Sequence, residues 1–93
     1  MNTRQRLENW GRYAASIKSG RAPDDEVALV DAMKMDHAIE ALSVEHSIIL
    51  RQCFVLGESP EIICRALGIP TRPAMIFVDR VYAAVIALEN SLE

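Results

Sequence analysis

The stretch that decides the fold is SPEIICRALGIPTRPAMIFV, residues 59–78. Ser59 has the side chain of a helix N-cap, and Pro60 suits the first helical turn, so a helix is expected to begin here. The apolar residues that follow have helical spacing: they are Ile62, Ile63, Ala66 and Leu67. Gly68 can adopt the left-handed conformation that ends a helix, and Ile69 is expected to insert into the core. The stretch therefore predicts a short helix, a tight turn and the start of another helix.

Thr71 is expected to cap this next helix, and Pro73 is tolerated within its first turn. Apolar residues then recur at steps of four, three, four and three, which predicts one continuous buried stripe. The residues of that stripe are Ala74, Val78, Val81, Val85 and Leu88. A capped helix, a glycine turn and a second helix form a helix-turn-helix, so the expected activity is macromolecular recognition.

The same signals predict three earlier helices. The first covers about residues 3–18, with Leu7, Trp10, Ala14 and Ile17 on its inner side. The second runs from near Pro23 to Leu42, with an inner side made of Val27, Val30, Met33 or Lys34, His37 or Ala38, Ile39 and Leu42. The third follows the cap Ser43 over residues 44–56, carries Ile48, Ile49, Cys53 and Leu56, and ends at Gly57.

These elements define an all-α, five-helix small domain, because β-branched runs are short and helically spaced. Its 93 residues are taken as a single domain, 1–93, with the helix-turn-helix unit at 43–90. The basic helix within residues 1–20 either caps the bundle or is peripheral. In the second case it could detach, exchange between subunits or contact nucleic acid.

Charge is unevenly distributed along the chain. Residues 1–22 hold five basic side chains against one acid, whereas residues 23–47 hold seven acids against one lysine. Acids after Pro23 are explained most simply as partners of a helix dipole, with a functional acidic patch as the alternative. Because the net charge is −3, DNA binding would require the few cations to gather on one face or a partner to add affinity.

Other classes of function find little support in the sequence. No catalytic motif is recognised, so an enzyme is not expected, and no cofactor is expected. Cys53 and Cys64 lack the close spacing of a zinc or redox pair, and His37 and His46 add no metal-binding frame, so no metal site is predicted. No apolar run is long enough to span a bilayer, and a cytoplasmic protein without membrane association is expected.

Two parts of the chain resemble known transcription proteins. ALSVEHSIILR at 41–51, followed by GESPEIICRALGIP at 57–70, resembles the helix-turn-helix of region 4 of bacterial sigma factors. RLENWGRY at 6–13 and DAMKMDHAIEAL at 31–42 are similar to the phage antitermination Q family, of the lambdoid type without a zinc insert. Together the two resemblances cover nearly all of the chain.

The resemblance implies a phage or prophage regulator that binds double-stranded DNA, engages bacterial RNA polymerase and makes it read through terminators. By match to the motif, the groove-facing residues of the recognition helix would be Thr71, Arg72, Met75, Ile76 and Arg80. Additional DNA contacts would come from Arg4, Arg6 and Arg12 of the first helix.

The recognition helix departs from this family pattern. A DNA-reading helix needs polar side chains at the groove, but this helix offers Met75, Ile76 and Phe77. At least Ile76 is expected to face away from the local core, and an exposed apolar patch indicates a protein partner. The open alternative is that the first helix covers the patch. A second hypothesis is therefore a protein-interaction module that uses these three residues to form a homodimer or to dock on polymerase.

Overall fold

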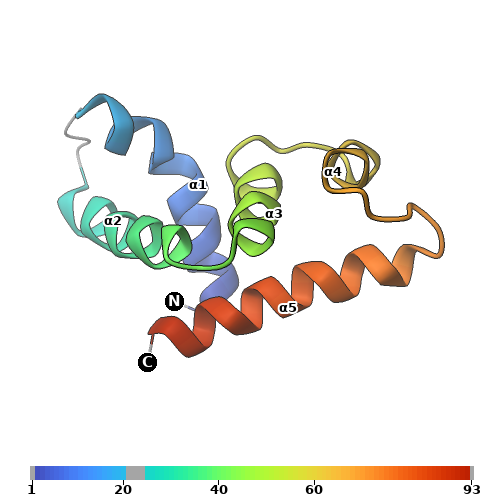
Figure 1. Ribbon diagram of the computed structural model, residues 1–93. Helices are drawn as coiled ribbons and strands as arrows, with labels where there is room; N and C mark the ends of the chain where they lie inside the picture. The colour runs from blue at the N-terminus through green and yellow to red at the C-terminus, as the bar shows by residue number, and fades with distance from the viewer. Residues whose placement is uncertain (1, 21–24, 93) are drawn as a thin grey trace.

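The computed structural model describes residues 2–20 and 25–92. Over these residues the chain forms five α-helices and no strand, which confirms the all-α, five-helix class. In chain order the helices are α1 (Thr3–Ser19), α2 (Glu26–Glu40), α3 (Val44–Phe54), α4 (Pro60–Leu67) and α5 (Ala74–Leu92). The described chain is elongated, 42 × 26 × 20 Å, with α1 and α2 at one end and α4 at the other (Figure 1).

Local side-chain chemistry explains where most of the helices begin. Asn2 caps α1 in a reciprocal capping box with Gln5, and Asp25 caps α2 by accepting from the Ala28 backbone N–H. Ser43 and Ser59 cap α3 and α4, as their sequence predicts. Helices α1 and α4 end at the glycines Gly20 and Gly68, which have positive φ, and Gly68 was expected to end α4. The expectation that Gly57 is the C-cap of α3 is wrong, because the C-cap is Val55 and Gly57 turns the backbone two residues later.

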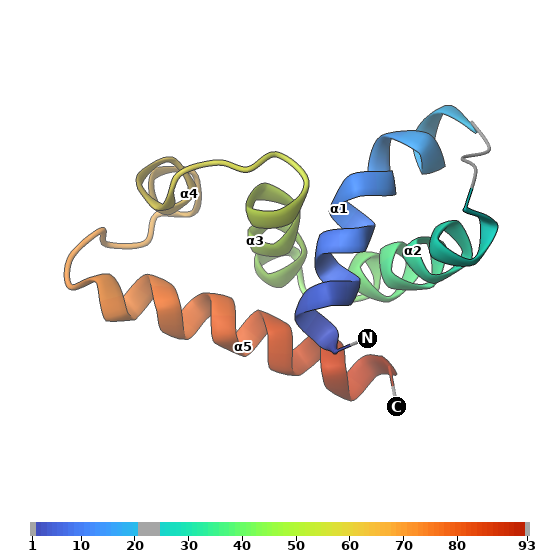
Figure 2. The ribbon, with the colours of Figure 1, turned by 180° about the vertical axis from the view of Figure 1, so that it is seen from behind.

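Helix α1 is an integral part of the fold. Its Leu7 and Trp10 are completely buried, and it packs chiefly on α2 and also on α3. In both views α1 lies against α2 and α3, and its N-terminal end is near the C-terminal end of α5 (Figures 1 and 2). Of the two arrangements that the sequence leaves open for this helix, the structure has the packed one.

The crossing of α1 over α3 depends on Gly11. A Cβ atom added there would lie 2.0 Å from the carbonyl oxygen of Phe54 and 2.9 Å from its carbonyl carbon. Only a residue without a side chain allows the two helix backbones to approach this closely.

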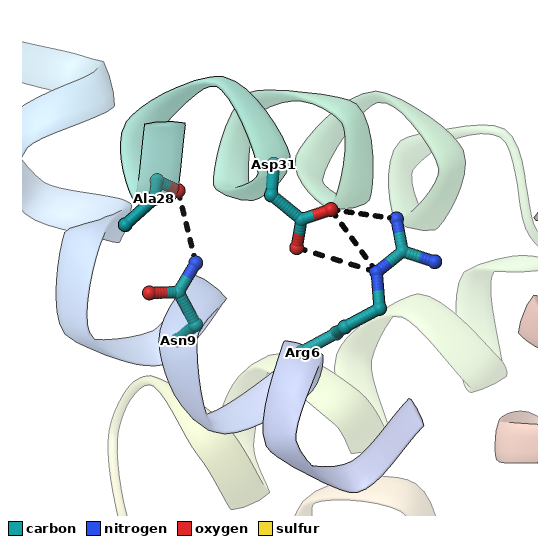
Figure 3. Close-up of polar contacts among 4 residues, drawn as sticks. All are labelled: Arg6, Asn9, Ala28 and Asp31. Atoms are coloured by element: carbon teal, nitrogen blue, oxygen red, sulfur yellow. Dashed lines mark hydrogen bonds and ion pairs between the residues drawn. The ribbon is translucent and has the colours of Figure 1, made fainter. Parts of the chain in front are cut away.

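Polar contacts also fix α1 against α2. The guanidinium of Arg6 donates from Nη2 to Asp31 Oδ1 at 2.8 Å and from Nε to both carboxylate oxygens, while the amide of Asn9 donates to the Ala28 carbonyl at 2.9 Å (Figure 3). Trp10 directly follows Asn9 on α1, and its indole Nε1 donates to Asp36 Oδ1 of α2 at 3.0 Å. Because these contacts are partly buried, they fix the register of α1 against α2 and also stabilise the packing of the two helices.

Arg51 of α3 joins the same cluster. Its guanidinium lies 3.5 Å from Asp36 Oδ1 and over the Trp10 ring, 5.4 Å from the ring centroid. A cation above an indole face is attracted by the ring's electron density. Trp10 is thus the core anchor that the sequence predicts, held by one carboxylate and one guanidinium from two neighbouring helices.

One apolar core runs through all five helices. Its buried residues come from α1 (Leu7, Trp10), α2 (Met35, Ala38, Ile39), α3 (Ile49, Leu50), α4 (Ile63, Cys64), the following turn (Ile69) and α5 (Ala84, Leu88). Ile69 is buried, as its sequence position predicts. Helix α5 packs mainly on α3 and only lightly on α4, so its N-terminal half extends beside α4 with one side open.

The predicted inner faces of α2 and α5 are correct only toward their C-terminal ends, at Ala38 and Ile39 of α2 and at Leu88 of α5. On α2, Val27, Val30 and Met33 are exposed, and the buried residues are Ala32, Met35, Ala38 and Ile39. On α5, Ala74 and Val78 are exposed and Val81 and Val85 are half-buried, so the expected stripe is buried only at Leu88. Both helices are apolar around much of their circumference, and periodicity alone cannot fix the rotation of such a helix.

Three predicted boundaries also need correction. Helix α5 begins at Ala74, three residues after Thr71, so Thr71 is not its N-cap. Pro73 explains this, because the residue before a proline is disfavoured in helical conformation and the helix cannot include Arg72. Helix α2 begins after Asp25 and ends at Glu40, two residues before Leu42, and its expected start at Pro23 lies outside the described residues. Helix α3 ends at Phe54, two residues before Leu56.

Candidate interaction surface

The most distinctive surface is the open side of α5. Met75 is 70% exposed, Tyr82 is 65% exposed and Val78 is 58% exposed, although all three are large apolar or aromatic residues. Half-buried Val85 continues the row, and Ile86, 40% exposed, flanks it. We call these five residues the α5 seam. From Met75 to Val85 the spacing is three, four and three residues, the heptad spacing that places apolar side chains along one seam of a coiled coil.

Two apolar hollows lie beside this seam. The first, about 260 Å³, is lined by Val78, Val81, Tyr82 and Val85, together with Phe77. These first four residues have the spacing i, i+3, i+4 and i+7, which is the set that surrounds an inserted side chain in knobs-into-holes packing. The surface of α5 therefore already contains a hole of the kind that a facing helix fills.

The second hollow is the cleft between α4 and α5, about 220 Å³. Helix α4 contributes Pro60, Glu61 and Cys64, the turn contributes Thr71, and α5 contributes Ala74, Phe77 and Val78. Phe77 and Val78 line both hollows, so the two are adjacent along α5. The lining of the cleft is almost entirely apolar, which suits the ring of an aromatic side chain.

The arginines expected at DNA divide into two groups. Arg6 is bound to Asp31, and Arg80 forms an ion pair with Glu45 of α3 at 2.5 Å. Exposed Arg4 forms an i,i+4 pair with Glu8 at 3.3 Å, a contact of small energy. Arg12 and Arg72 are exposed, as is Thr71. The arginines of α1 and α5 therefore do not gather into one basic face, because two of them hold helices together.

The three apolar residues singled out in the sequence have different surroundings. Met75 is exposed as expected, but Ile76 and Phe77 are half-buried and pack against the core, so the expectation that Ile76 faces away from it is wrong. Helix α1 does not cover this patch. It meets α5 at the opposite end, where the Thr3 hydroxyl donates to Glu89 Oε2 at 2.8 Å (Figure 2).

Tyr82 and Ile86 belong to the surface but were not anticipated. For Tyr82 the signal was present in the sequence as the heptad spacing from Met75, which competes with the stripe that begins at Ala74, whereas Ile86 lies outside both patterns. The two patterns share Val78 and Val85. Packing decides between them, because Phe77, Ala84 and Leu88 turn toward the core and leave the heptad positions at the surface.

A second exposed apolar group lies on α2. Val27, Val30 and Met33 are at least half exposed. A broad, open hollow of about 700 Å³ beside them is lined by Val30, Met33, Lys34 and His37 of α2 and by Leu92 of α5, among others. Lys34 and His37 interrupt its apolar lining, so this surface is more polar than the hollows beside the α5 seam.

The cysteines and histidines form no functional cluster in the described part of the chain. Both cysteines are free thiols, and no group of three His, Cys, Asp or Glu side chains among residues 2–20 and 25–92 could hold a metal ion. Burial raises the pKa of the Cys53 thiol, which makes the thiolate scarcer at neutral pH. Cys64 is buried at the floor of the α4–α5 cleft.

Comparisons with protein-family models, with curated proteins and with solved structures found no match to this chain. None of the helices described is both long and apolar enough to cross a membrane.

Proposed function

We propose that this chain is a protein-interaction module and that the α5 seam is its binding surface. The observation that supports the proposal is a heptad-spaced row of apolar side chains, 58–70% exposed at its first three positions, on the helix that the sequence motif marks for recognition. Large apolar side chains gathered in this way on a soluble domain favour association with another protein, because their burial is the main source of binding energy.

The distribution of charge supports protein association over DNA reading. Arg80 forms an ion pair with Glu45 of α3. Its side chain therefore points toward α3 and away from the α5 seam. The exposed side chains of the α5 seam are Met75, Val78, Tyr82 and Ile86, and the neighbouring charged residue is Asp79. The carboxylate would repel a phosphate backbone, and the largely apolar seam would leave most base edges without hydrogen-bond partners.

The sequence resemblance to the Q antiterminators suggests a phage or prophage protein with bacterial RNA polymerase as the first partner to test. The test is titration of the fluorescently labelled chain with polymerase core enzyme and with holoenzyme, for the wild type and for Tyr82→Ala. Tyr82 is exposed, so its removal should leave the fold intact while weakening binding about tenfold or more. A matched control is the uncharged change Ala83→Gln, at an exposed position of the same helix outside the seam.

Binding that is equally strong in the Tyr82→Ala variant would show that the α5 seam is not the contact surface. Absence of binding to polymerase, combined with absence of self-association at any concentration, would refute the interaction function itself.

A second candidate function is DNA binding by the helix-turn-helix, and one observation favours it. Thr71 and Arg72 are exposed in the turn before α5, close in sequence to exposed Arg65 of α4, and in the described residues neither arginine forms an ion pair. These groups could contact phosphates, with Arg12 on a different helix adding to the total.

Anisotropy titrations with fluorescent duplexes at low and moderate salt test this candidate. If the chain binds DNA, its affinity should fall steeply as the salt concentration rises. The slope of log affinity against log salt concentration should become shallower by about one unit in Arg72→Ala if Arg72 contacts a phosphate. An affinity that is undetectable at low salt, with polymerase present, would eliminate it.

A further inference from the structure

We propose that the partner of the α5 seam is a second copy of the same chain, paired through α5 in antiparallel orientation about a two-fold axis. This inference specifies the partner of the proposed interaction function and rests on it. Three independent features of α5 support it: the symmetry of its apolar row, the two hollows, and the placement of its terminal charges.

The apolar row is self-complementary when it is reversed. If the axis passes at the level of residue 80, Met75 lies opposite Val85 of the second copy and Val78 lies opposite Tyr82. Arg80 does not obstruct this axis because it points to Glu45 of its own α3. A two-fold interface requires one surface to match itself in this way, since each contact occurs twice.

The two hollows lie opposite the side chains that the second copy would insert in this pairing. At the same level, Val78 of the second copy faces the hole formed by Val78, Val81, Tyr82 and Val85. Tyr82 of the second copy faces the turn of α5 that carries Ala74, Phe77 and Val78, which is the wall of the α4–α5 cleft. The tyrosine ring would fill this apolar cleft.

The charges at the ends of α5 are placed against its own dipole. Its first turn contains no acidic residue and follows Arg72, while its last turn contains no basic residue and carries Glu89. A helix is stabilised by the opposite arrangement, acids at the start and bases at the end. Antiparallel pairing corrects this mismatch, because it brings Glu89 of one copy beside Thr71, Arg72 and the N-terminus of α5 in the other.

The same geometry explains why the association should be weak and adjustable. A two-heptad seam is smaller than a standard interface of about 800 Å² per partner, so a dissociation constant in the micromolar range is expected. Asp79 is exposed on the flank of the seam nearest the axis, and the two copies of this carboxylate would repel each other. Asp79→Asn should therefore tighten the dimer several-fold.

Sedimentation velocity of the full chain over a hundredfold range of concentration is the first test. The wild type should pass from monomer to dimer, Tyr82→Ala should shift the transition to about tenfold higher concentration or beyond, and the uncharged change Ala83→Gln should leave it unchanged. Circular dichroism of each variant verifies that the helix content is retained.

A charge exchange tests the antiparallel orientation. Glu89→Arg places like charges next to each other at both ends of the pair, so it should weaken the dimer, and adding Arg72→Glu should restore it. The double variant has opposite charges across the interface again, and each end of its α5 now also suits the helix dipole. Failure of the second change to restore the dimer would overturn the orientation.

Two further outcomes would overturn the second-copy partner. One is a monomer at every concentration, and the other is a dimer that is lost with Val30→Asp of α2 and kept with Tyr82→Ala. If the chain stays monomeric while Tyr82→Ala still weakens polymerase binding, the interaction function stands and only the inference about a second copy fails.

Discussion

Replacing Gly11 by alanine should destabilise the protein even though alanine is the better helix former. Gly11 lies inside α1, where alanine normally stabilises a helix by about 1 kcal/mol relative to glycine. At this position, however, the new Cβ would lie 2.0 Å from the Phe54 carbonyl oxygen, and that oxygen belongs to the backbone of α3 and cannot rotate away.

The magnitude follows from the size of the clash. A Cβ and a carbonyl oxygen need more than 3 Å between them, so α1 and α3 must separate by over 1 Å at their crossing point. Overpacking of this kind costs about 1–3 kcal/mol and more where backbone must move, so we take about 3 kcal/mol. After the gain in helix propensity, the net destabilisation should be about 2 kcal/mol, which lowers Tm by roughly 8–16 °C for a domain of this size.

Urea and thermal unfolding followed by circular dichroism measure this change. The control is Ala15→Gly, an exposed position of the same helix, which should cost about 1 kcal/mol through helix propensity alone. If Gly11→Ala were as stable as the wild type or more stable, α1 would not cross α3 in contact with Phe54, and the packing described for this end of the molecule would be wrong.

Three other predictions concern the contacts that hold the helices. Arg6→Ala should cost about 1–2 kcal/mol of unfolding free energy because it removes a bidentate, partly buried contact to Asp31, whereas exposed Arg4→Ala should cost less than about 0.5 kcal/mol; equal urea midpoints for the two variants would contradict this. Trp10→Phe should cost about 2 kcal/mol by removing the hydrogen bond to Asp36, and an unchanged midpoint would show that this bond contributes nothing. Since burial raises the pKa of Cys53, the folded state holds the thiol proton more tightly than the unfolded state, so this group stabilises the fold below its ordinary pKa and the contribution is lost as pH rises above it. Alkylation of Cys53 at neutral pH should accordingly be slower than that of an unfolded control at the same pH, and mass spectrometry that found equal rates would refute the burial of this thiol.

The sequence predicts the helices better than their faces. Caps and glycine turns are local signals, so Ser43, Ser59 and Gly68 locate α3 and α4 within a few residues. Helix α1 has a narrow apolar face among charged residues, and its predicted inner residues, among them Leu7 and Trp10, are buried or half-buried as expected. Helices α2 and α5 have too many apolar residues for one face, so their rotation is set by neighbours that periodicity does not reveal.

The same limit applies to the candidate surface. Heptad spacing from Met75 can be read in the sequence, but so can the stripe from Ala74, and only the packing of Phe77 and Leu88 against the core selects between them. The role of Gly11 was not predictable, because the residue that excludes a side chain there, Phe54, lies on another helix. Likewise, Arg6 and Arg80 form ion pairs with acidic residues that are distant in sequence. Because they are paired, these two arginines are not free to contact DNA.

The most direct measurement of the central claim is a dilution series of ¹H–¹⁵N correlation spectra on the full chain. We expect concentration-dependent shifts at the α5 seam and around the α4–α5 cleft, at Met75, Val78, Tyr82 and Thr71, with the exposed face of α2 unaffected. Shifts centred on Val27, Val30 and Met33, or spectra identical at every concentration, would contradict it.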